Sequence, residues 1–323
     1  MNMNFSVYSA EDGGGAGKAE IKKAIKKLRS LVLYNKQEPE PFRKKLESNF
    51  SSIFLPAKVE YSTKKYGNVQ CDVLTPEVAA TKRTIIYIHG GSFVGGSCKS
   101  YKSFCASFAA ESSSKIIVPE YRLSPKHPFP AALEDIQAVF RDLYTQLRGS
   151  LTLEPEIIIA ADGSGASIAL ALIQTLKGPY RQFVRNIILF SPWLDMSPQS
   201  PKILDKKATD GIISSDALRR SGDLYTYESN LTNPLVSPLL MSEEKLTDFP
   251  PVYIQCGSNE ILLDEIKQFE QKLQANNTPI ILDIWPKMVF MFQMAHEFLP
   301  QAHLAIQRVA KYIKDFNKTQ EEE

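Results

Sequence analysis

Short apolar runs alternate with longer amphipathic segments along most of the chain. Six runs rich in Ile, Val and Leu are typical of buried strands, and the segments between them carry apolar residues at helical spacing. This alternation predicts an α/β fold, in which helices cover both faces of a mostly parallel sheet. The predicted strands are 84–89, 114–120, 156–161, 185–190, 251–255 and 279–285, and the predicted helices are 101–111, 131–148, 164–176, 261–275 and 298–317.

The pattern changes at the start of the chain and in one internal stretch. Residues 21–32 place apolar side chains on one helical face and lysines on the other. A basic amphipathic helix can lie on a membrane surface, but we favour an ordinary helix that packs its apolar face on the domain. A short helix at 41–49 and two strands at 58–63 and 69–74 are expected to follow. Between 191 and 249 the alternation stops, which is typical of a lid or another functional insertion.

Composition narrows the class of protein. With 323 residues, 43% of them hydrophobic, the chain can bury a large core. A net charge of +2 does not indicate a nucleic-acid surface, and no run approaches the roughly 20 apolar residues that span a bilayer. The first residues contain no apolar stretch of the kind found in secretory signals. The four cysteines are scattered and predict reduced thiols, so we expect a cytoplasmic protein without a metal or cofactor.

Two glycine-containing motifs follow predicted strands. The run from Ile157 to Ser167 indicates a buried strand, a sharp turn and a helix of small residues, which is the geometry that mounts a catalytic serine in many hydrolases. His89-Gly90-Gly91 ends an earlier strand, where glycine N–H groups can point into a cleft and stabilise an oxyanion. A plain turn is the alternative for the second motif, although it would need fewer glycines and no histidine.

A third segment, taken together with these two motifs, indicates one particular family. Residues 120–135 contain Tyr-Arg-Leu-Ser-Pro-Lys-His-Pro and then Pro-Ala-Ala. Together with His89-Gly-Gly and the turn at 161–166, this segment resembles the hormone-sensitive-lipase-like α/β-hydrolase family of carboxylesterases and lipases. The resemblance implies the α/β-hydrolase fold, a mostly parallel eight-stranded sheet flanked by helices, with a helical cap. The likeness continues through 191–195, 233–238, 255–264 and 285–288, and covers roughly residues 55–316.

The resemblance also divides the chain. The α/β-hydrolase domain is expected to cover 56–317, with 195–245 inserted as a cap or lid. Residues 18–55 are expected to form cap helices that precede this domain. Residues 1–17 are interpreted as a flexible tail, and 318–323 as an acidic tail.

The nucleophile position of the resemblance holds no serine. In the family the turn is Gly-Asp-Ser-Ala-Gly, and keeping Asp162 and Gly165 in register places Gly163 at the nucleophile and Ser164 one residue later. Shifting the register to rescue Ser164 puts Asp162 where the tight turn needs a small residue. The oxyanion hole implied by the resemblance consists of the N–H groups of Gly90, Gly91 and Ser164.

Of the family's other two catalytic positions, this chain keeps one and has lost the other. The acid position is retained as Glu260, whereas the histidine position holds Phe290. Glycine offers no nucleophilic oxygen and phenylalanine no base, so little or no hydrolase activity is predicted. Without its imidazole, Glu260 is expected either to find another donor or to have its pKa raised by desolvation.

These substitutions favour a non-catalytic pseudoenzyme that binds a small acyl, ester or carboxylate ligand. The first alternative is an active carboxylesterase that uses Ser164, or less favourably Ser92 or Ser167, with His296 as its base. The second alternative is a protein-interaction scaffold whose cleft has filled. The C-terminal helices also leave a homodimer open.

Overall fold

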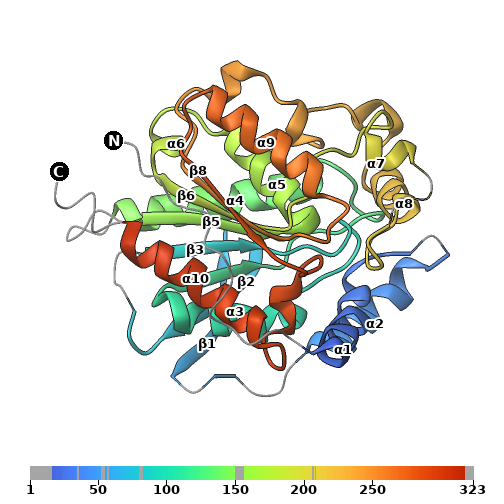
Figure 1. Ribbon diagram of the computed structural model, residues 1–323. Coiled ribbons are helices and arrows are strands. Elements are labelled where there is room, and N and C mark those ends of the chain that lie inside the picture. Colours follow the sequence, from blue (N-terminus) through green and yellow to red (C-terminus); the bar gives the residue numbers. More distant parts are fainter. Residues whose placement is uncertain are drawn as a thin grey trace.

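The eight predicted strands form one sheet in the computed structural model, which describes residues 17–316 except 35, 52–54, 57, 80–82, 150–155, 206 and 208. The two predicted tails lie outside the described residues, apart from residue 17. The strand order is β1-β2-β4-β3-β5-β6-β7-β8 (Figure 1). The first two pairs, β1 with β2 and β2 with β4, are antiparallel, and all the others are parallel, as predicted. The strands are β1 (Val59–Tyr66), β2 (Val69–Pro76), β3 (Arg83–Ile88), β4 (Lys115–Pro119), β5 (Glu156–Asp162), β6 (Val184–Phe190), β7 (Val252–Gly257) and β8 (Ile280–Trp285).

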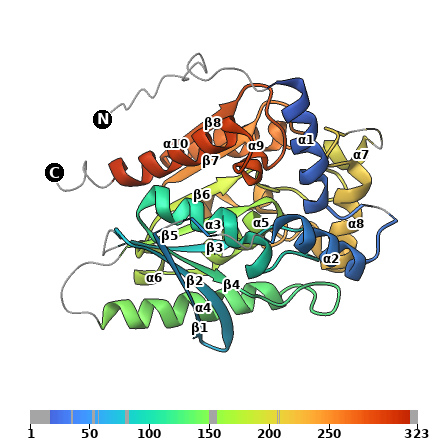
Figure 2. The ribbon, with the colours of Figure 1, turned by 90° about the horizontal axis from the view of Figure 1, so that it is seen from below.

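Helices cover both faces of this sheet (Figure 1 and Figure 2). On one face α3 packs against α10, and on the other lie α4, α5 and α9. The helices are α1 (Lys18–Leu28), α2 (Pro39–Phe50), α3 (Cys98–Ser112), α4 (Ala131–Arg148), α5 (Gly163–Thr175), α6 (Pro179–Gln182), α7 (Pro201–Leu204), α8 (Ser215–Tyr225), α9 (Leu263–Ala275) and α10 (Pro300–Phe316). Short 3-10 turns are η1 (Arg29–Leu31), η2 (Glu228–Asn230), η3 (Pro238–Leu240), η4 (Glu243–Leu246) and η5 (Phe292–Ala295).

The N-terminal helices pack on the domain through their apolar faces. Ala24 and Leu28 of α1 are buried in the main core, which is the arrangement favoured for this basic helix. Past the end of α1, the Arg29 side chain donates to the carbonyl oxygen of Gly211 at 2.7 Å. The segment before the sheet therefore contacts the insertion between β6 and β7, and Figure 1 shows α1, α2, α7 and α8 at the same end of the sheet.

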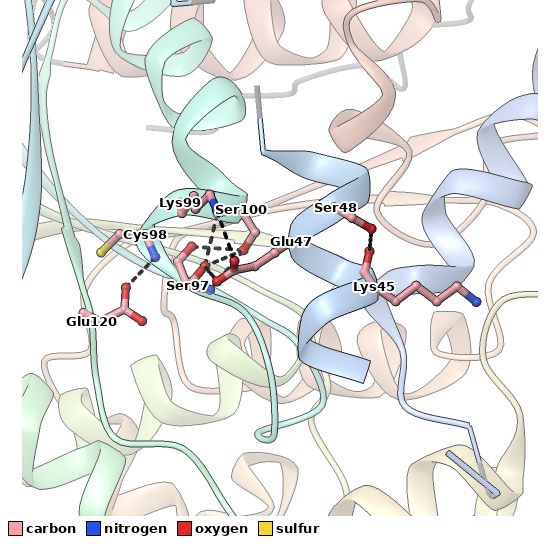
Figure 3. Close-up of polar contacts among 8 residues, drawn as sticks. All are labelled: Lys45, Glu47, Ser48, Ser97, Cys98, Lys99, Ser100 and Glu120. Carbon is pink, nitrogen blue, oxygen red and sulfur yellow. Dashed lines mark hydrogen bonds and ion pairs between the residues drawn. The ribbon is translucent and has the colours of Figure 1, made fainter. Parts of the chain in front are cut away.

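The start of α3 is tied to α2 and to the end of β4 (Figure 3). Ser97 caps the helix, because its Oγ accepts the N–H of Ser100 at 3.2 Å. The same hydroxyl donates to Glu47 on α2 at 3.2 Å, and the N–H of Cys98 donates to Glu120 beyond β4 at 2.7 Å. These bonds anchor the loop between β3 and α3, which contains the glycine motif.

The insertion between β6 and β7 contains the helices α7 and α8, where the hydrophobic pattern predicts no regular element. The side chain of Ser214 caps α8 by accepting the N–H of Ala217 at 3.2 Å. The helix buries Ala217, Leu218 and Tyr225. The helix consists mainly of polar residues and glycine, so it does not stand out as an apolar segment in the sequence.

The four cysteines all lie within the described residues, and all are buried and unpaired, as predicted. Burial raises the pKa of each thiol, so these side chains stay protonated at neutral pH. In the described part of the chain, every helix is too short or too polar to cross a membrane.

Candidate functional site

The strand β5 runs directly into α5 through a sharp turn with Gly163 at its apex. Gly163 is the first residue of the helix and has a φ of +46°, a conformation that glycine adopts without strain. At Gly165 a Cβ atom would lie 2.3 Å from the carbonyl oxygen of Ile88 and 2.4 Å from that of His89. Only glycine fits there, so the turn keeps the close approach between helix and strand that a nucleophile mount needs.

Aromatic side chains fill the space above Gly163. A Cβ atom at this position would lie 3.1 Å from Cζ of Phe290 and 3.8 Å from Nε1 of Trp193. Trp193 meets Phe93 edge-on, with ring centroids 6.0 Å apart. These three side chains are at most 3% exposed. An ester approaching the turn would therefore meet packed rings instead of an open cleft.

The insertion between β6 and β7 covers this aromatic cluster from another side. Tyr225, at the end of α8, stacks on Phe93 with the ring centroids 3.9 Å apart and the planes inclined by 8°. Its ring is buried together with that of Phe93. Burying the apolar faces of two aromatic rings against each other removes apolar surface from water and so stabilises the fold. The insertion thus packs over the turn as part of the core.

The three candidate serines all have structural partners. Ser164 is 1% exposed, and its Oγ accepts the N–H of Phe93 at 3.0 Å. Ser167 is buried and donates to the carbonyl oxygen of Trp193 at 2.7 Å. Ser92 accepts a backbone N–H of the N-terminal segment at 3.0 Å. Each hydroxyl therefore joins one part of the backbone to another.

His296 lies apart from these serines, directly after η5. Its ring packs edge-on against Phe104 of α3, with centroids 6.1 Å apart. Burial lowers its pKa, and its Nδ1 has no hydrogen-bond partner among the described residues. In the described part of the chain no hydrogen bond joins His296 to Ser164, Ser92 or Ser167, so the structure does not assemble the alternative catalytic pair.

Glu260 has acquired new donors. One carboxylate oxygen, Oε1, accepts the hydroxyl of Ser191 at 2.9 Å and the N–H of Gly257. The Ser191 hydroxyl in turn accepts the N–H of Met291 at 3.1 Å, which links the acid to the loop that carries Phe290. Burial raises the pKa of Glu260 from 4.5 to about 8. An expected donor is present as the Gly257 N–H, and Ser191 is a second partner that the sequence did not indicate.

The glycine motif is held by a second buried carboxylate. Asp162 accepts the N–H of Gly90 and the hydroxyl of Tyr87, each at 2.9 Å, and the hydroxyl of Tyr101 at 2.8 Å. Burial raises its pKa to about 7. The Gly90 N–H is thus directed at Asp162, although the resemblance assigned it to the oxyanion hole. An acid flanked by small residues at the end of a buried strand was the only sequence signal for this role of Asp162.

The rest of the motif is also packed tightly. The ring of His89 stacks on Tyr121, with centroids 4.3 Å apart, and the Tyr121 hydroxyl donates to the His89 carbonyl oxygen at 2.6 Å. Burial lowers the pKa of His89, so it is neutral at pH 7. Gly91 has a φ of +118°, and a Cβ there would lie 2.4 Å from the carbonyl oxygen of Gly95. The Pro-rich block that contains Tyr121 therefore positions the glycine loop.

Comparison with known proteins agrees with this geometry. A family model described as alpha/beta hydrolase fold matches residues 85–294. An acetyl-hydrolase of Streptomyces hygroscopicus is 31% identical over 234 residues, which are 72% of this chain and 75% of that protein. An esterase of Acinetobacter venetianus is 32% identical over 236 residues, with the same two shares. A solved esterase of the bacterial hormone-sensitive lipase family has a TM-score of 0.80 at 23% identity, and the match covers 93% of this chain and 99% of that one. The chain therefore belongs to the α/β-hydrolase fold family, and the predicted resemblance to its hormone-sensitive-lipase-like esterases is confirmed.

Proposed function

We propose that this protein is a non-catalytic member of the carboxylesterase and lipase family. The observation that carries the proposal is the apex of the β5–α5 turn, where Gly163 lies beneath the ring of Phe290. At the two positions where the family needs an oxygen nucleophile and a base, the chain has a hydrogen atom and a phenyl ring. Glu260, the remaining member, is engaged by Ser191 and Gly257.

Neither neighbouring serines nor histidines replace the lost groups. A serine becomes a nucleophile when an adjacent base removes its proton, and Ser164 instead accepts the N–H of Phe93 in a buried position. His296 makes its contacts with α3 instead. A hydrolase that keeps only its oxyanion hole and binding contacts retains about 10³–10⁴-fold acceleration over water, far below an intact triad. The Gly90 amide, moreover, donates to Asp162.

The proposal gives the former active site a structural role. One named relative is an esterase and another is an acetyl-hydrolase, so esters and carboxylates are the ligand class that the family implies. In this chain a ligand at the β5–α5 turn would have to displace the rings of Phe290 and Trp193. The packing of these rings favours a filled cleft over a retained acyl site, and a stable scaffold over a binder of small esters at this place.

The test is hydrolysis of p-nitrophenyl acetate and butyrate. We expect the wild type and Ser164→Ala to show the same rate, equal to the background rate of the buffer. The double variant Gly163→Ser with Phe290→His restores the two missing groups, and activity that appears only in this variant supports the proposal. Wild-type turnover that Ser164→Ala abolishes would overturn it, because Ser164 would then be the nucleophile.

A further inference from the structure

The two N-terminal helices concentrate positive charge at one end of the molecule. Residues 18–50 contain ten lysine and arginine residues and four glutamates, which gives a net charge of +6 in a chain whose total is +2. The helices α1 and α2 are neighbours, since Nζ of Lys27 lies 4.9 Å from the ring centroid of Phe50, and both lie at the same end of the sheet (Figure 1 and Figure 2). The apolar face of α1 packs on the core. Its polar face is therefore the one that is left to meet a partner.

The glutamates of this segment are already engaged. Glu20 accepts the N–H of Gly17 at 3.0 Å, at the start of α1. The other three form ion pairs, two of them with basic residues outside the segment. These pairs are Glu38 with Arg220 at 3.5 Å, Glu40 with Arg43 at 3.7 Å and Glu47 with Lys99 at 3.4 Å. The negative charges of the segment are thus matched by groups other than its exposed lysines.

The two arginines of the segment hold the fold together. Arg29 donates to the carbonyl oxygen of Gly211 at 2.7 Å, which ties α1 to the insertion between β6 and β7. Arg43 donates from Nε to the carbonyl oxygen of Val94 at 2.7 Å, and from Nη2 to that of Ser124 at 2.9 Å. Both guanidinium groups therefore have structural partners, and the positive charge that remains free belongs to lysines.

Five exposed lysines of the segment form what we call the lysine surface. In the part of the chain that the structure describes, none of their ammonium groups has an ion pair or a hydrogen bond. Lys22 and Lys26 are one helical turn apart, so they lie on the same side of α1. The side chain of Lys45 extends from α2 away from the start of α3 (Figure 3). The five residues are Lys22 and Lys26 on α1, Lys36 between the helices, and Lys44 and Lys45 on α2.

The composition of the lysine surface indicates the kind of partner. A lysine ammonium group is a point charge on a flexible stem, whereas arginine is suited to bidentate recognition of phosphates and bases. Proteins that bind single-stranded nucleic acids also offer aromatic side chains on which bases stack. Among the described residues of 18–50, every aromatic side chain is buried or half-buried. An anionic lipid surface requires neither arginines nor aromatic rings, because its head groups attract basic residues by charge alone.

We propose that the lysine surface docks this protein on the anionic head groups of a phospholipid membrane. The contact is electrostatic and involves no insertion of a helix, since the apolar faces of α1 and α2 are packed on the domain. Each lysine near such a surface strengthens binding about fivefold. The inference goes beyond the proposed function and uses no residue of the former active site. Esterase activity would overturn the proposed function and leave this contact unaffected.

The test is co-sedimentation of the full-length protein with vesicles of phosphatidylcholine and phosphatidylserine in a ratio of about 7:3, with vesicles of phosphatidylcholine alone as the uncharged reference. We expect the wild type to sediment with the mixed vesicles at about 0.1 M salt and to stay in solution with the reference vesicles. Raising the salt to about 0.5 M should release it, because the charges are exposed and therefore screened.

Two double variants remove charge from the lysine surface without touching the core. Lys22→Gln with Lys26→Gln changes α1, and Lys44→Gln with Lys45→Gln changes α2. Each pair should weaken binding to the mixed vesicles about 25-fold. The matched control is Lys311→Gln with Lys314→Gln, which removes two exposed charges near the C-terminal end of α10, at the opposite end of the molecule (Figure 1). This control should leave the affinity unchanged.

Several results would contradict this proposal. Wild-type protein that ignores the mixed vesicles, or that binds both kinds of vesicle equally, would show that anionic lipid is not recognised. An equal loss of affinity in the α10 control would mean that net charge, and not the lysine surface, is responsible. A single-stranded RNA or polyglutamate that binds more tightly than the mixed vesicles, and loses its affinity in the α1 variant, would assign the surface to a nucleic acid or to an acidic protein.

Discussion

Adding a single methyl group at the apex of the β5–α5 turn tests whether Gly163 and Phe290 form one packed unit. In Gly163→Ala the new Cβ would meet Cζ of Phe290 at 3.1 Å, closer than ordinary van der Waals contact. A positive φ, here +46°, costs a residue with a side chain about 1–2 kcal/mol. Overpacking in a rigid core costs about 1–3 kcal/mol more. We therefore expect a loss of about 2–5 kcal/mol in the free energy of unfolding, a large share of a typical domain's stability.

Urea unfolding of a double-mutant cycle separates the two contributions. Phe290→Leu removes the Cζ atom that the new methyl group would meet, so in this background Gly163→Ala should cost only the backbone share of about 1–2 kcal/mol. Gly178 is the matched control, because its φ is +52° and no atom lies within 4 Å of the place of a Cβ. Gly178→Ala should therefore lower the free energy of unfolding only by the cost of its positive φ.

Two outcomes would refute the reasoning. If Gly163→Ala were neutral, the rings of Phe290 and Trp193 could not be packed against the turn as described. If Gly163→Ala lowered the free energy of unfolding equally with Phe290 and with Leu at position 290, the contact between the new methyl group and the Phe290 ring would not contribute to stability. Either result would reopen the space above the turn to a ligand, and with it the interpretation that the former active site still binds one.

Three further predictions concern buried polar groups. The folded-state pKa of Glu260, about 8, lies above its ordinary value of 4.5, so the folded protein keeps a proton that the unfolded chain loses. The wild-type free energy of unfolding should fall as pH rises from 4.5 to 8, and Glu260→Gln should reduce this fall by a few kcal/mol, measured by urea midpoints at about pH 5 and about pH 8. Ser191→Ala leaves Glu260 and the Met291 N–H without their shared partner and should cost about 1–3 kcal/mol in thermal unfolding. Lys202→Met leaves Glu265 as a buried unpaired charge and should cost about 3–5 kcal/mol, much of which the additional change Glu265→Leu should restore.

The sequence predicts the sheet well where strands are buried. The apolar run at 156–161 matches β5, Glu156–Asp162, to within one residue. The prediction is poorer for β1, which continues to Tyr66 and pairs only with β2 at the edge of the sheet. Most of its side chains are exposed, so apolar periodicity carries little information there. The helix α3 begins three residues before the predicted start, because Ser97 and Ser100 cap it.

The site is predictable only in part for a similar reason. Spacing within a motif identifies Gly163 and Phe290, since the turn and the loop each occupy a short stretch. The partners of these positions come from distant stretches. Ser191 and Glu260 are 69 residues apart in the chain, and no local pattern indicates that one donates to the other. The stack of Phe93 on Tyr225 likewise depends on how the insertion folds back over the sheet.

The most direct test of the central claim is labelling with a fluorophosphonate, which reacts with activated serines. Intact-mass analysis of the wild-type protein should show no adduct under conditions in which an active serine esterase is fully labelled. Gly163 offers no hydroxyl, and the Ser164 hydroxyl is buried and accepts the N–H of Phe93. A stoichiometric adduct that maps to Ser164, and that Ser164→Ala removes, would contradict the account and identify a working hydrolase.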